Sequence, residues 1–222
     1  SWQGEIWNRR KSGEIYLEAI SIGAVKDEQG RVTHYVSTFF DITSSKSSEE
    51  QVRRLAFFDP LTQLPNRRLL LERLEHALSS CARHKSRGAV LCIDLDNFKA
   101  VNDTVGQQEG DQLLEQVAQI LLSCVREEDT VARLGSDEFV VMLEALSEED
   151  MEAARRAEVV GTKILQALHR SFQLGSSAHR CSASVGITLF GDNPAERVDE
   201  PLKRADLAMA QAKQAGRNQL CF

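Results

Sequence analysis

The sequence predicts an α/β fold, an α+β sandwich with a ferredoxin-like βαββαβ core and extra flanking helices, preceded by a partial antiparallel β unit. Three observations predict it. Apolar residues recur at helical spacing in several segments, short apolar runs separate those segments, and the N-terminal residues alternate β-rich runs with turn signals. An order of βαββαβ gives a ferredoxin-like sandwich.

Residues 1–43 predict the partial β unit. They carry β-rich runs at 5–8, 15–25 and 32–40, joined by tight turns. Three strands cannot close a robust core alone, so we expect the end of a larger domain.

A helical linker is expected over residues 44–58. Serine and glutamate residues open it, and Val52, Leu55, Ala56 and Phe58 follow at helical spacing. Such a helix packs against its copy in a dimer or lies on its own domain, and the sequence leaves both open.

Residues 59–222 predict the α/β domain, in which helices with apolar stripes alternate with short strands. The strand pair in its middle is joined by a tight turn at Gly135 and Ser136. The elements are expected as helix 67–83, strand 88–93, helix 108–125, strands 130–134 and 139–143, a helix from 148 to about 169, strand 181–190, helix 200–215 and a final short strand.

Composition excludes several classes of protein. The formal net charge of −6 argues against a nucleic-acid-binding surface, which is normally basic. The 5 cysteines are odd in number and lack a C-x-x-C pair, so neither a disulfide framework nor a zinc site is indicated. No apolar run approaches the roughly 20 residues that span a bilayer. We expect these residues to be cytoplasmic and to make no membrane contact themselves. A membrane anchor upstream of Ser1 in the parent protein stays compatible with the sequence.

Acidic residues stand where strands end. Asp94 ends a buried strand, and Asp137 and Glu138 follow the hairpin turn, so neighbouring strands could bring them together. Clustered carboxylates repel unless a cation joins them, and Mg²⁺ prefers oxygen ligands together with substrate phosphates. A solvated polar turn is the alternative.

Two further groups suit a nucleotide. Asn102 and Asp111 flank a glycine-containing loop, and a carboxylate can accept both N–H donors of guanine, which adenine lacks. Lys213 and Arg217 bracket Gly216 at a helix end and suit phosphate oxygens. Cations in a last helical turn also simply favour the helix dipole.

The domain resembles GGDEF diguanylate cyclases, and the preceding residues resemble the C-terminal strands of a PAS domain. The PAS resemblance rests on the run 4–14 followed by Asp41-Ile42-Thr43. The GGDEF resemblance rests on motifs that occur in order: the run 59–68 (DPLTQLPNRR), the run 94–99 with Asn102-Asp103 and Gly110-Asp111, the turn 133–139 (RLGSDEF), the strand 184–186 and the terminal run 213–218.

The resemblance implies that two GTP molecules condense into cyclic di-GMP with release of two pyrophosphates. It implies Mg²⁺ or Mn²⁺ ligands at Asp94, the Leu95 carbonyl and Asp137, with Asp137 also helping to deprotonate the ribose 3′-hydroxyl. Lys99 would stabilise the developing charge, and Glu138 would orient that lysine. These are the expected catalytic and metal residues.

The expected substrate contacts follow from the same resemblance. Asn102 and Asp111 match the guanine-reading positions, Gln107 stands in the substrate site where histidine is usual, and Lys213 and Arg217 match the triphosphate contacts. One GTP per domain implies a homodimer.

An inhibitory product site is also implied. Arg126 and Asp129 form the R-x-x-D pattern upstream of the turn, where the family often binds its product. Arginine pairs with phosphate or stacks on guanine, and aspartate accepts guanine's N–H donors. An exposed charged loop is the alternative.

The sequence departs from the family pattern in four places. Ser136 replaces the second glycine of the turn, Gln63 replaces a glycine, Ala210 replaces a tyrosine, and Gln107 replaces the histidine. A glycine allows positive φ or close approach of the backbone to a ligand, so Ser136 is expected to slow turnover. The alternatives are a weakly active GTP-binding module that regulates a phosphodiesterase domain beyond Phe222, and a plain dimerisation domain.

Overall fold

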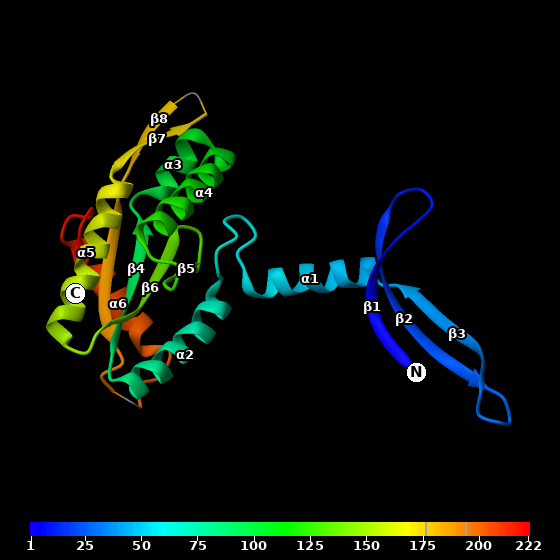
Figure 1. Cartoon of the computed structure of the whole chain (residues 1–222). Helices are drawn as coiled ribbons and strands as arrows, with labels where there is room; N and C mark the ends of the chain where they lie inside the picture. Colours follow the sequence, from blue (N-terminus) through cyan, green and yellow to red (C-terminus); the bar gives the residue numbers. More distant parts are fainter. Residues whose placement is uncertain (176, 194) are drawn as a thin grey trace. The chain divides into compact units, whose positions relative to one another are not determined.

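The computed structural model describes residues 1–175, 177–193 and 195–222 (Figure 1). The chain divides into two compact units, Ser1–Ala56 and Phe57–Phe222. Across the described residues, no helix is both long and apolar enough to cross a membrane.

The N-terminal unit is a three-stranded antiparallel sheet followed by a helix. Gly13 and Gly30 take positive φ of 93° and 80° between the strands, where a residue with a Cβ would be strained. The backbone N–H of Leu17 donates to Thr43 Oγ1 at 2.8 Å and ties the start of the helix to the sheet. The elements are β1 (Trp2–Arg9), β2 (Ile15–Lys26), β3 (Val32–Asp41) and α1 (Thr43–Phe57), with the sheet order β1-β2-β3.

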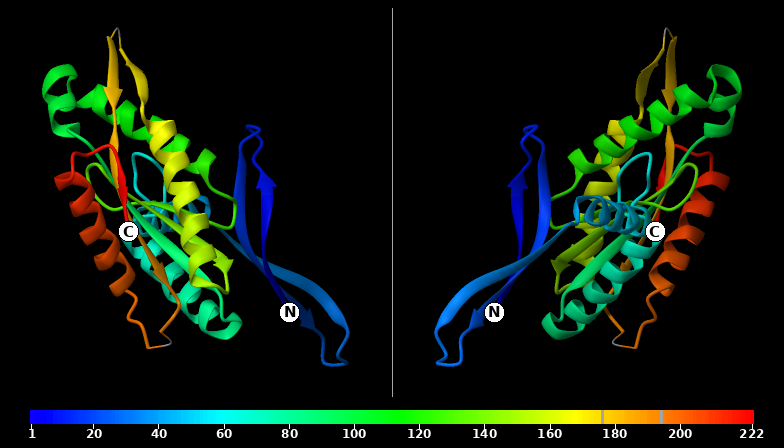
Figure 2. Two further views of the ribbon diagram at one scale, coloured as in Figure 1. Left: turned by 90° about the vertical axis from the view of Figure 1, so that its left-hand side faces the viewer. Right: turned by 90° about the vertical axis from the view of Figure 1, so that its right-hand side faces the viewer.

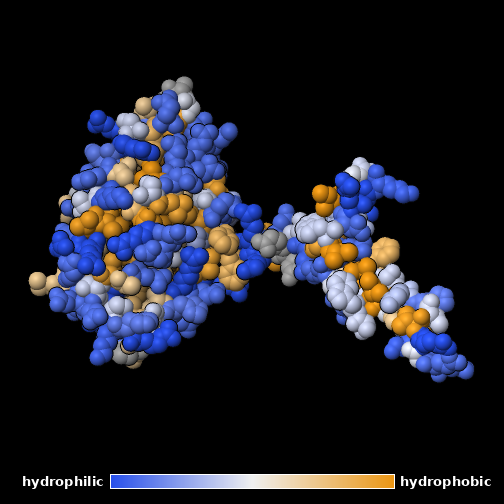
Figure 3. Space-filling model, in the orientation of Figure 1, coloured by the Kyte–Doolittle hydropathy of each residue, from blue (hydrophilic) through white to orange (hydrophobic). Residues whose placement is uncertain are grey.

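Large apolar side chains remain exposed on this sheet, as its orange patches in Figure 3 show. Trp7, Tyr35 and Phe40 are 69%, 73% and 71% exposed. Among the described residues, the buried apolar core begins only at Leu64. The sheet therefore has the composition of one layer of a two-layer structure.

The C-terminal unit is built on a five-stranded sheet in the order β10-β9-β4-β6-β5. Neighbouring strands are antiparallel except for the parallel pair β9 and β10. The inner order β9-β4-β6-β5 is that of a ferredoxin-like sandwich, so the predicted fold class is confirmed. The elements are α2 (Arg67–His84), β4 (Arg87–Leu95), α3 (Phe98–Val105), α4 (Gln107–Cys124), β5 (Thr130–Arg133), β6 (Glu138–Ser147), α5 (Asp150–Leu168), β7 (Arg170–Leu174), β8 (Ser177–Cys181), β9 (Ala183–Phe190), α6 (Glu200–Gln214) and β10 (Leu220–Cys221).

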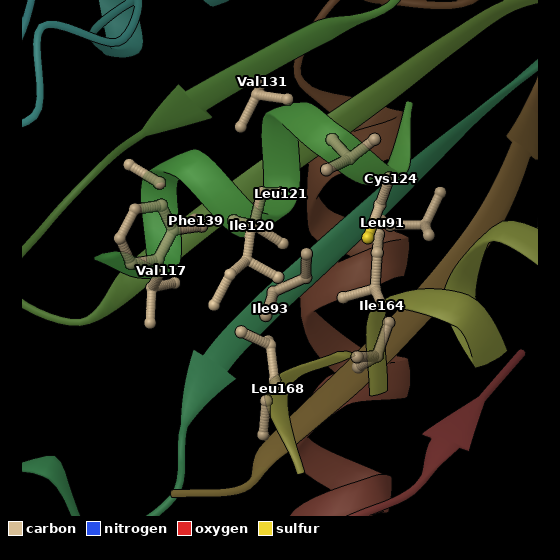
Figure 4. Packing of buried hydrophobic residues seen from close by; sticks show 14 of the residues in the cluster. Leu91, Ile93, Val117, Ile120, Leu121, Cys124, Val131, Phe139, Ile164 and Leu168 are labelled. Atoms are coloured by element: carbon tan, nitrogen blue, oxygen red, sulfur yellow. The ribbon is translucent and has the colours of Figure 1, made fainter. Parts of the chain in front are cut away.

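The central strand β4 is buried on both faces, which explains its continuous apolar run. Leu91 and Ile93 pack in the core formed with α4 and α5, shown in Figure 4. Val90 and Cys92 face the opposite way and pack with α2 and α6. Asp94 follows this second set at the end of the strand, so the fold aims it toward the side covered by α6.

Helix α6 lies unusually close to β9 because Gly186 has no side chain. A Cβ at Gly186 would stand 2.0 Å from the carbonyl oxygen of Ala205 and 2.1 Å from the backbone nitrogen of Met209. The close packing fixes the last turn of α6, which carries Lys213, against the sheet.

Three elements were not predicted: α3, β7 and β8. The glycine-containing loop predicted between Asn102 and Asp111 is wrong: residues 98–105 form the short helix α3, and only Gly106, at φ 101°, separates it from α4. The hairpin β7–β8 extends beyond the main sheet (Figure 2). Cys181, predicted as the first residue of strand 181–190, is instead the last residue of β8, and β9 begins at Ala183. Eight residues give too short an apolar period to predict α3, and β7 and β8 alternate mostly polar side chains.

Candidate active site

Asp94 and the β5–β6 turn meet at one edge of the sheet. Asp94 stands directly opposite Glu138 of β6 and Ser184 of β9 in the strand registers. The backbone N–H of Leu95 donates to the carbonyl oxygen of Asp137 at 3.3 Å. The structure therefore brings together the expected metal and catalytic positions Asp94, Leu95, Asp137 and Glu138.

The carboxylate of Asp94 lies in an acidic environment with one close cation. Nζ of Lys213 is 2.7 Å from Asp94 Oδ2. Burial raises the pKa of Asp94, the negative charges of Asp137 and Asp96 add to the rise, and the Lys213 ammonium group opposes it. A second cation at this edge would relieve the remaining repulsion.

The oxygen donors at this edge fit a hard divalent cation. Within residues 1–175, 177–193 and 195–222, no group of three or more histidine, cysteine, aspartate or glutamate side chains could hold a metal. Asp94 and Asp137 supply two carboxylates, and the Leu95 carbonyl is the third expected ligand. Mg²⁺ commonly binds through one or two carboxylates with phosphates and water completing its shell, so this donor set suits it.

The turn between β5 and β6 does not use positive φ. Neither Gly135 nor Ser136 has it, so Ser136 stands there without the left-handed strain that was one of the two expected effects of replacing glycine. The Ser136 hydroxyl donates a short hydrogen bond to Asp137 Oδ1. The side chain therefore touches an expected metal ligand.

Gln63, the other replaced glycine, does occupy a left-handed conformation, with φ 58°. Its backbone N–H donates to the carbonyl oxygen of Asp59 at 2.9 Å, and its Nε2 donates to the carbonyl oxygen of Pro60 at 2.7 Å. The turn before α2 thus keeps the backbone conformation for which glycine is best suited.

The turn before α2 is connected to the β5–β6 turn through Arg133. Nη1 of Arg133 donates to Asp59 Oδ1 at 2.9 Å, and Nη2 donates to the carbonyl oxygen of Ser136 at 2.7 Å. The backbone N–H of Arg133 donates to the carbonyl oxygen of Pro65 at 2.9 Å. One side chain therefore holds both turns in place.

The expected guanine-reading residues lie on α3 and α4. Oδ1 of Asn102 is buried and has no hydrogen-bond partner in the protein. A Cβ at Gly110 would stand 1.7 Å from that oxygen, so only glycine leaves room for the amide. A buried polar atom without a partner is costly unless a ligand or water satisfies it. Asp111, next to Gly110, is half-buried in the first turns of α4.

Four expected substrate or catalytic side chains are solvent-exposed: Lys99 in the first turn of α3, Gln107 at the start of α4, Glu138 at the start of β6, and Arg217 after α6. Arg217 and Asn218 have positive φ of 63° and 48°, and Gly216 has φ 122°. The chain therefore reverses sharply after α6 and presents Arg217 near the end that carries Lys213.

The expected inhibitory pair lies at the start of β5, whereas the turn with Asp137 lies at its end. Arg126 and Asp129 line a hollow of ≈ 460 Å³ together with Arg155, Arg156 and Lys163 of α5. Asp129 Oδ2 accepts from the Arg126 N–H at 2.9 Å, and burial raises its pKa. The cations from α5 were not anticipated, because they follow 26 or more positions later in the sequence with a helical pattern of their own.

Two residues near this edge of the sheet were not predicted from the sequence. Asp96 is buried and accepts hydrogen bonds from Ser182 Oγ and Ser184 Oγ, each at 2.7 Å. Arg133 is the other. Each has partners far away in the sequence, and the only local signal was that both lie inside segments that also carry expected site residues.

The fold and the site together define a ferredoxin-like α/β domain whose sheet edge carries paired carboxylates beside a helix-borne lysine. The model of the family described as "Diguanylate cyclase, GGDEF domain" matches residues 56–219. The chain therefore belongs to the GGDEF domain family.

Known proteins support this membership. The chain is 44% identical over 181 residues, 81% of its length, to the bifunctional diguanylate cyclase/cyclic di-GMP phosphodiesterase MucR of Pseudomonas aeruginosa, and covers 25% of that protein. It is 37% identical over 181 residues, 82% of its length, to the cyclic di-GMP phosphodiesterase PdeR of Escherichia coli K12, and covers 26% of it. The chain thus spans about a quarter of the length of these relatives.

A solved structure shares the fold. The coiled coil and GGDEF domain of DgcB from Caulobacter crescentus, in complex with c-di-GMP, matches with a TM-score of 0.71 and 26% identity, over 81% of this chain and 92% of that one.

Proposed function

We propose that this chain is a diguanylate cyclase that joins two GTP molecules into cyclic di-GMP and releases two pyrophosphates. The observation that carries the proposal is the sheet edge at which Asp94, paired with Lys213 at 2.7 Å, lies opposite Glu138 and beside Asp137. MucR is named a bifunctional diguanylate cyclase/cyclic di-GMP phosphodiesterase, and the DgcB structure contains c-di-GMP, which supports the same chemistry here.

The proposed binding mode divides the nucleotide between two ends of the site. The unpartnered Asn102 Oδ1 and the Asp111 carboxylate would accept the N–H donors of guanine. Gln107 would complete that contact. Lys213 and Arg217 would bind the triphosphate through charge-assisted hydrogen bonds. Lys213 would then exchange its contact with Asp94 for phosphate oxygens.

Magnesium or manganese, held by Asp94, Asp137 and the Leu95 carbonyl, would neutralise phosphate charge and acidify the attacking hydroxyl. Asp137 accepts the proton of the ribose 3′-hydroxyl of one GTP. The 3′-oxygen then forms a bond to the α-phosphorus of the other GTP. The bond between that phosphorus and the oxygen bridging the α- and β-phosphates breaks, and pyrophosphate leaves. Lys99, oriented by Glu138, stabilises the developing charge. A second, equivalent step closes the ring.

The proposed assembly is a homodimer, because each domain holds one GTP and the reaction needs two that face each other. The three strands of Ser1–Ala56 would be the end of a PAS-type sensor domain and α1 its signalling helix, with boundaries at 43 and 58. Arg126 and Asp129 would bind cyclic di-GMP as an inhibitor. The α5 cations that line the same hollow supply further phosphate contacts. The protein would act in the cytoplasm.

A second candidate function is a GTP-binding module with little turnover that regulates an attached phosphodiesterase. Two observations favour it: the Ser136 hydroxyl occupies an oxygen of Asp137, and the relative PdeR is named a phosphodiesterase.

The test is incubation of the purified chain with GTP and Mg²⁺, followed by separation of nucleotides. The cyclase proposal expects cyclic di-GMP from GTP and no cyclic dinucleotide from ATP. GTP binding without product favours the regulatory module, and absence of GTP binding favours a plain dimerisation domain.

A further inference from the structure

Asp96 lies two residues after Asp94 and makes contacts that no expected catalytic role explains. Its side chain accepts from Ser184 Oγ on Oδ1 at 2.7 Å, and on Oδ2 from Ser182 Oγ at 2.7 Å and from the backbone N–H of Asn218 at 3.1 Å. Its own backbone N–H donates to the carbonyl oxygen of Ser182 at 2.9 Å. One buried carboxylate thus ties three separate parts of the chain together.

The contact to Asn218 fixes the turn that follows α6. That turn has left-handed conformations at Arg217 and Asn218, and the N–H of Arg217 donates to the carbonyl oxygen of Ala212 at 3.0 Å. Asn218, the residue that Asp96 contacts, directly follows Arg217 in the chain. The contact therefore fixes the position of the turn relative to the end of β4.

Both sides of the proposed phosphate site depend on this connection. Asp94 belongs to β4, two residues before Asp96, whereas Lys213 and Arg217 belong to the end of α6 and its turn. Lys213 reaches Asp94 from α6 itself, packed on the sheet at Gly186. Arg217 lies beyond the helix, where the backbone contact to Asp96 holds the turn.

We propose that Asp96 is a positioning residue that holds the turn carrying Arg217 at the distance from Asp94 needed to bind the terminal phosphates of the nucleotide. The proposal rests on the proposed use of GTP. It assigns to Asp96 the discrimination between a nucleoside triphosphate and a nucleoside monophosphate.

A carboxylate suits this role better than an amide. An ionised carboxylate has two acceptor oxygens and no donor, so it accepts from two hydroxyls and one N–H together. In Asp96→Asn, the amide oxygen can take the place of Oδ2 and still accept from the N–H of Asn218, while the NH₂ group donates to the rotated Ser184 hydroxyl. Asp96→Ala leaves no side-chain acceptor at this position, so it is the variant that removes the turn contact.

The experiment measures the dissociation constants of GTP and GMP by calorimetry for the wild-type chain, Asp96→Ala, and the matched control Ser184→Ala, which removes a hydroxyl bond to Asp96 without touching the turn. We expect the preference for GTP over GMP to fall about tenfold or more in Asp96→Ala, as the loss of one charge-assisted contact would predict. GMP affinity should remain, and the control should keep the wild-type preference.

An unchanged preference for GTP over GMP in a folded Asp96→Ala variant would overturn the inference, as would an equal loss in Ser184→Ala. Failure of the wild-type chain to bind GTP would instead refute the proposed function on which the inference rests. Should Asp96→Ala fail to fold, Gly216→Ala takes its place. A Cβ at Gly216 meets no atom within 4 Å, so that variant strains only the turn at φ 122°. A wild-type preference in Gly216→Ala would also overturn the inference.

Discussion

Arg133 and Asp59 form an ion pair of 2.9 Å between Nη1 and Oδ1, with side chains only 10% and 18% exposed. Arg133 also donates to the carbonyl oxygen of Ser136, so the pair joins the turn before α2 to the turn that carries Asp137. Through Arg133 of β5, the β5–β6 turn is therefore connected to Asp59 outside the hairpin, in addition to being held by strand pairing.

Asp59→Asn should destabilise the chain by about 2 kcal/mol, because removal of one charge leaves a largely buried guanidinium without its partner. Urea unfolding measures this loss. Lys203→Ala is the control, since its ion pair with Asp199 is more exposed, at 59% and 32%, and should contribute under about 1 kcal/mol. Equal losses of unfolding free energy in the two variants would show that the Asp59–Arg133 ion pair stabilises the fold no more than an exposed pair does.

The same pair predicts a pH dependence. Burial opposes the charged form of Asp59, but hydrogen bonds from Thr62 and Arg133 outweigh burial and hold its pKa below the usual value. A lowered native pKa stabilises the fold above the unfolded value of about 4, and this benefit is lost as the pH falls through the native value. The stability difference between wild type and Asp59→Asn should therefore shrink on acidification, and a constant difference would contradict the assignment.

Gln63→Gly should raise the free energy of unfolding by about 0.5 to 1 kcal/mol, because glycine adopts φ 58° without the cost of a Cβ. Gln63→Ala loses the same amide hydrogen bond to Pro60 but keeps the Cβ, so it should be no more stable than wild type. Thermal unfolding of the three proteins gives the comparison. An alanine variant as stable as the glycine variant would show that conformation is not the cause.

Ser136→Gly should speed cyclic di-GMP formation at saturating GTP and Mg²⁺, by up to about a hundredfold where the side chain displaces substrate by roughly 1 Å. Stability should not rise, because Ser136 has no positive φ to relieve. Ser136→Ala separates two causes, since it removes the hydroxyl on Asp137 but keeps the Cβ. A glycine variant no faster than wild type would mean that neither group limits turnover.

Arg126→Ala should leave the initial rate of cyclic di-GMP formation unchanged. The concentration of cyclic di-GMP that gives half-maximal inhibition should rise about tenfold or more. The side chain of Arg126 is 68% exposed and lies at the opposite end of β5 from Asp137, so the fold should be unaffected. Glu127→Ala, in the same loop, is the matched control. Equal inhibition of Arg126→Ala and wild type would show that this residue is a bystander.

Much of the fold was predictable because its elements carry clear apolar periods. The elements that were not predicted lack such a period. Helix α3 is 8 residues long and offers barely two turns of pattern, and the β7–β8 hairpin carries few apolar side chains.

The candidate site was predictable where chemistry is local, as at Asp94 after a buried strand and at Asp137 after a turn. It was not predictable where a residue acts through distant partners. Asp96 meets Asn218 across 122 positions, and Arg133 meets Asp59 across 74. The effect of Ser136 on Asp137 could not be foreseen either, since the sequence does not reveal the φ of a turn residue.

The most direct test of the proposed cyclase activity is the product ratio of the wild-type chain, supplied with GTP and Mg²⁺, with Asp94→Ala as the control. A diguanylate cyclase gives two pyrophosphates for each cyclic di-GMP from wild type, and neither from a folded Asp94→Ala variant, because the variant lacks an expected metal ligand. A wild-type dimer that binds GTP and forms no cyclic di-GMP, or a variant with unchanged turnover, would contradict it.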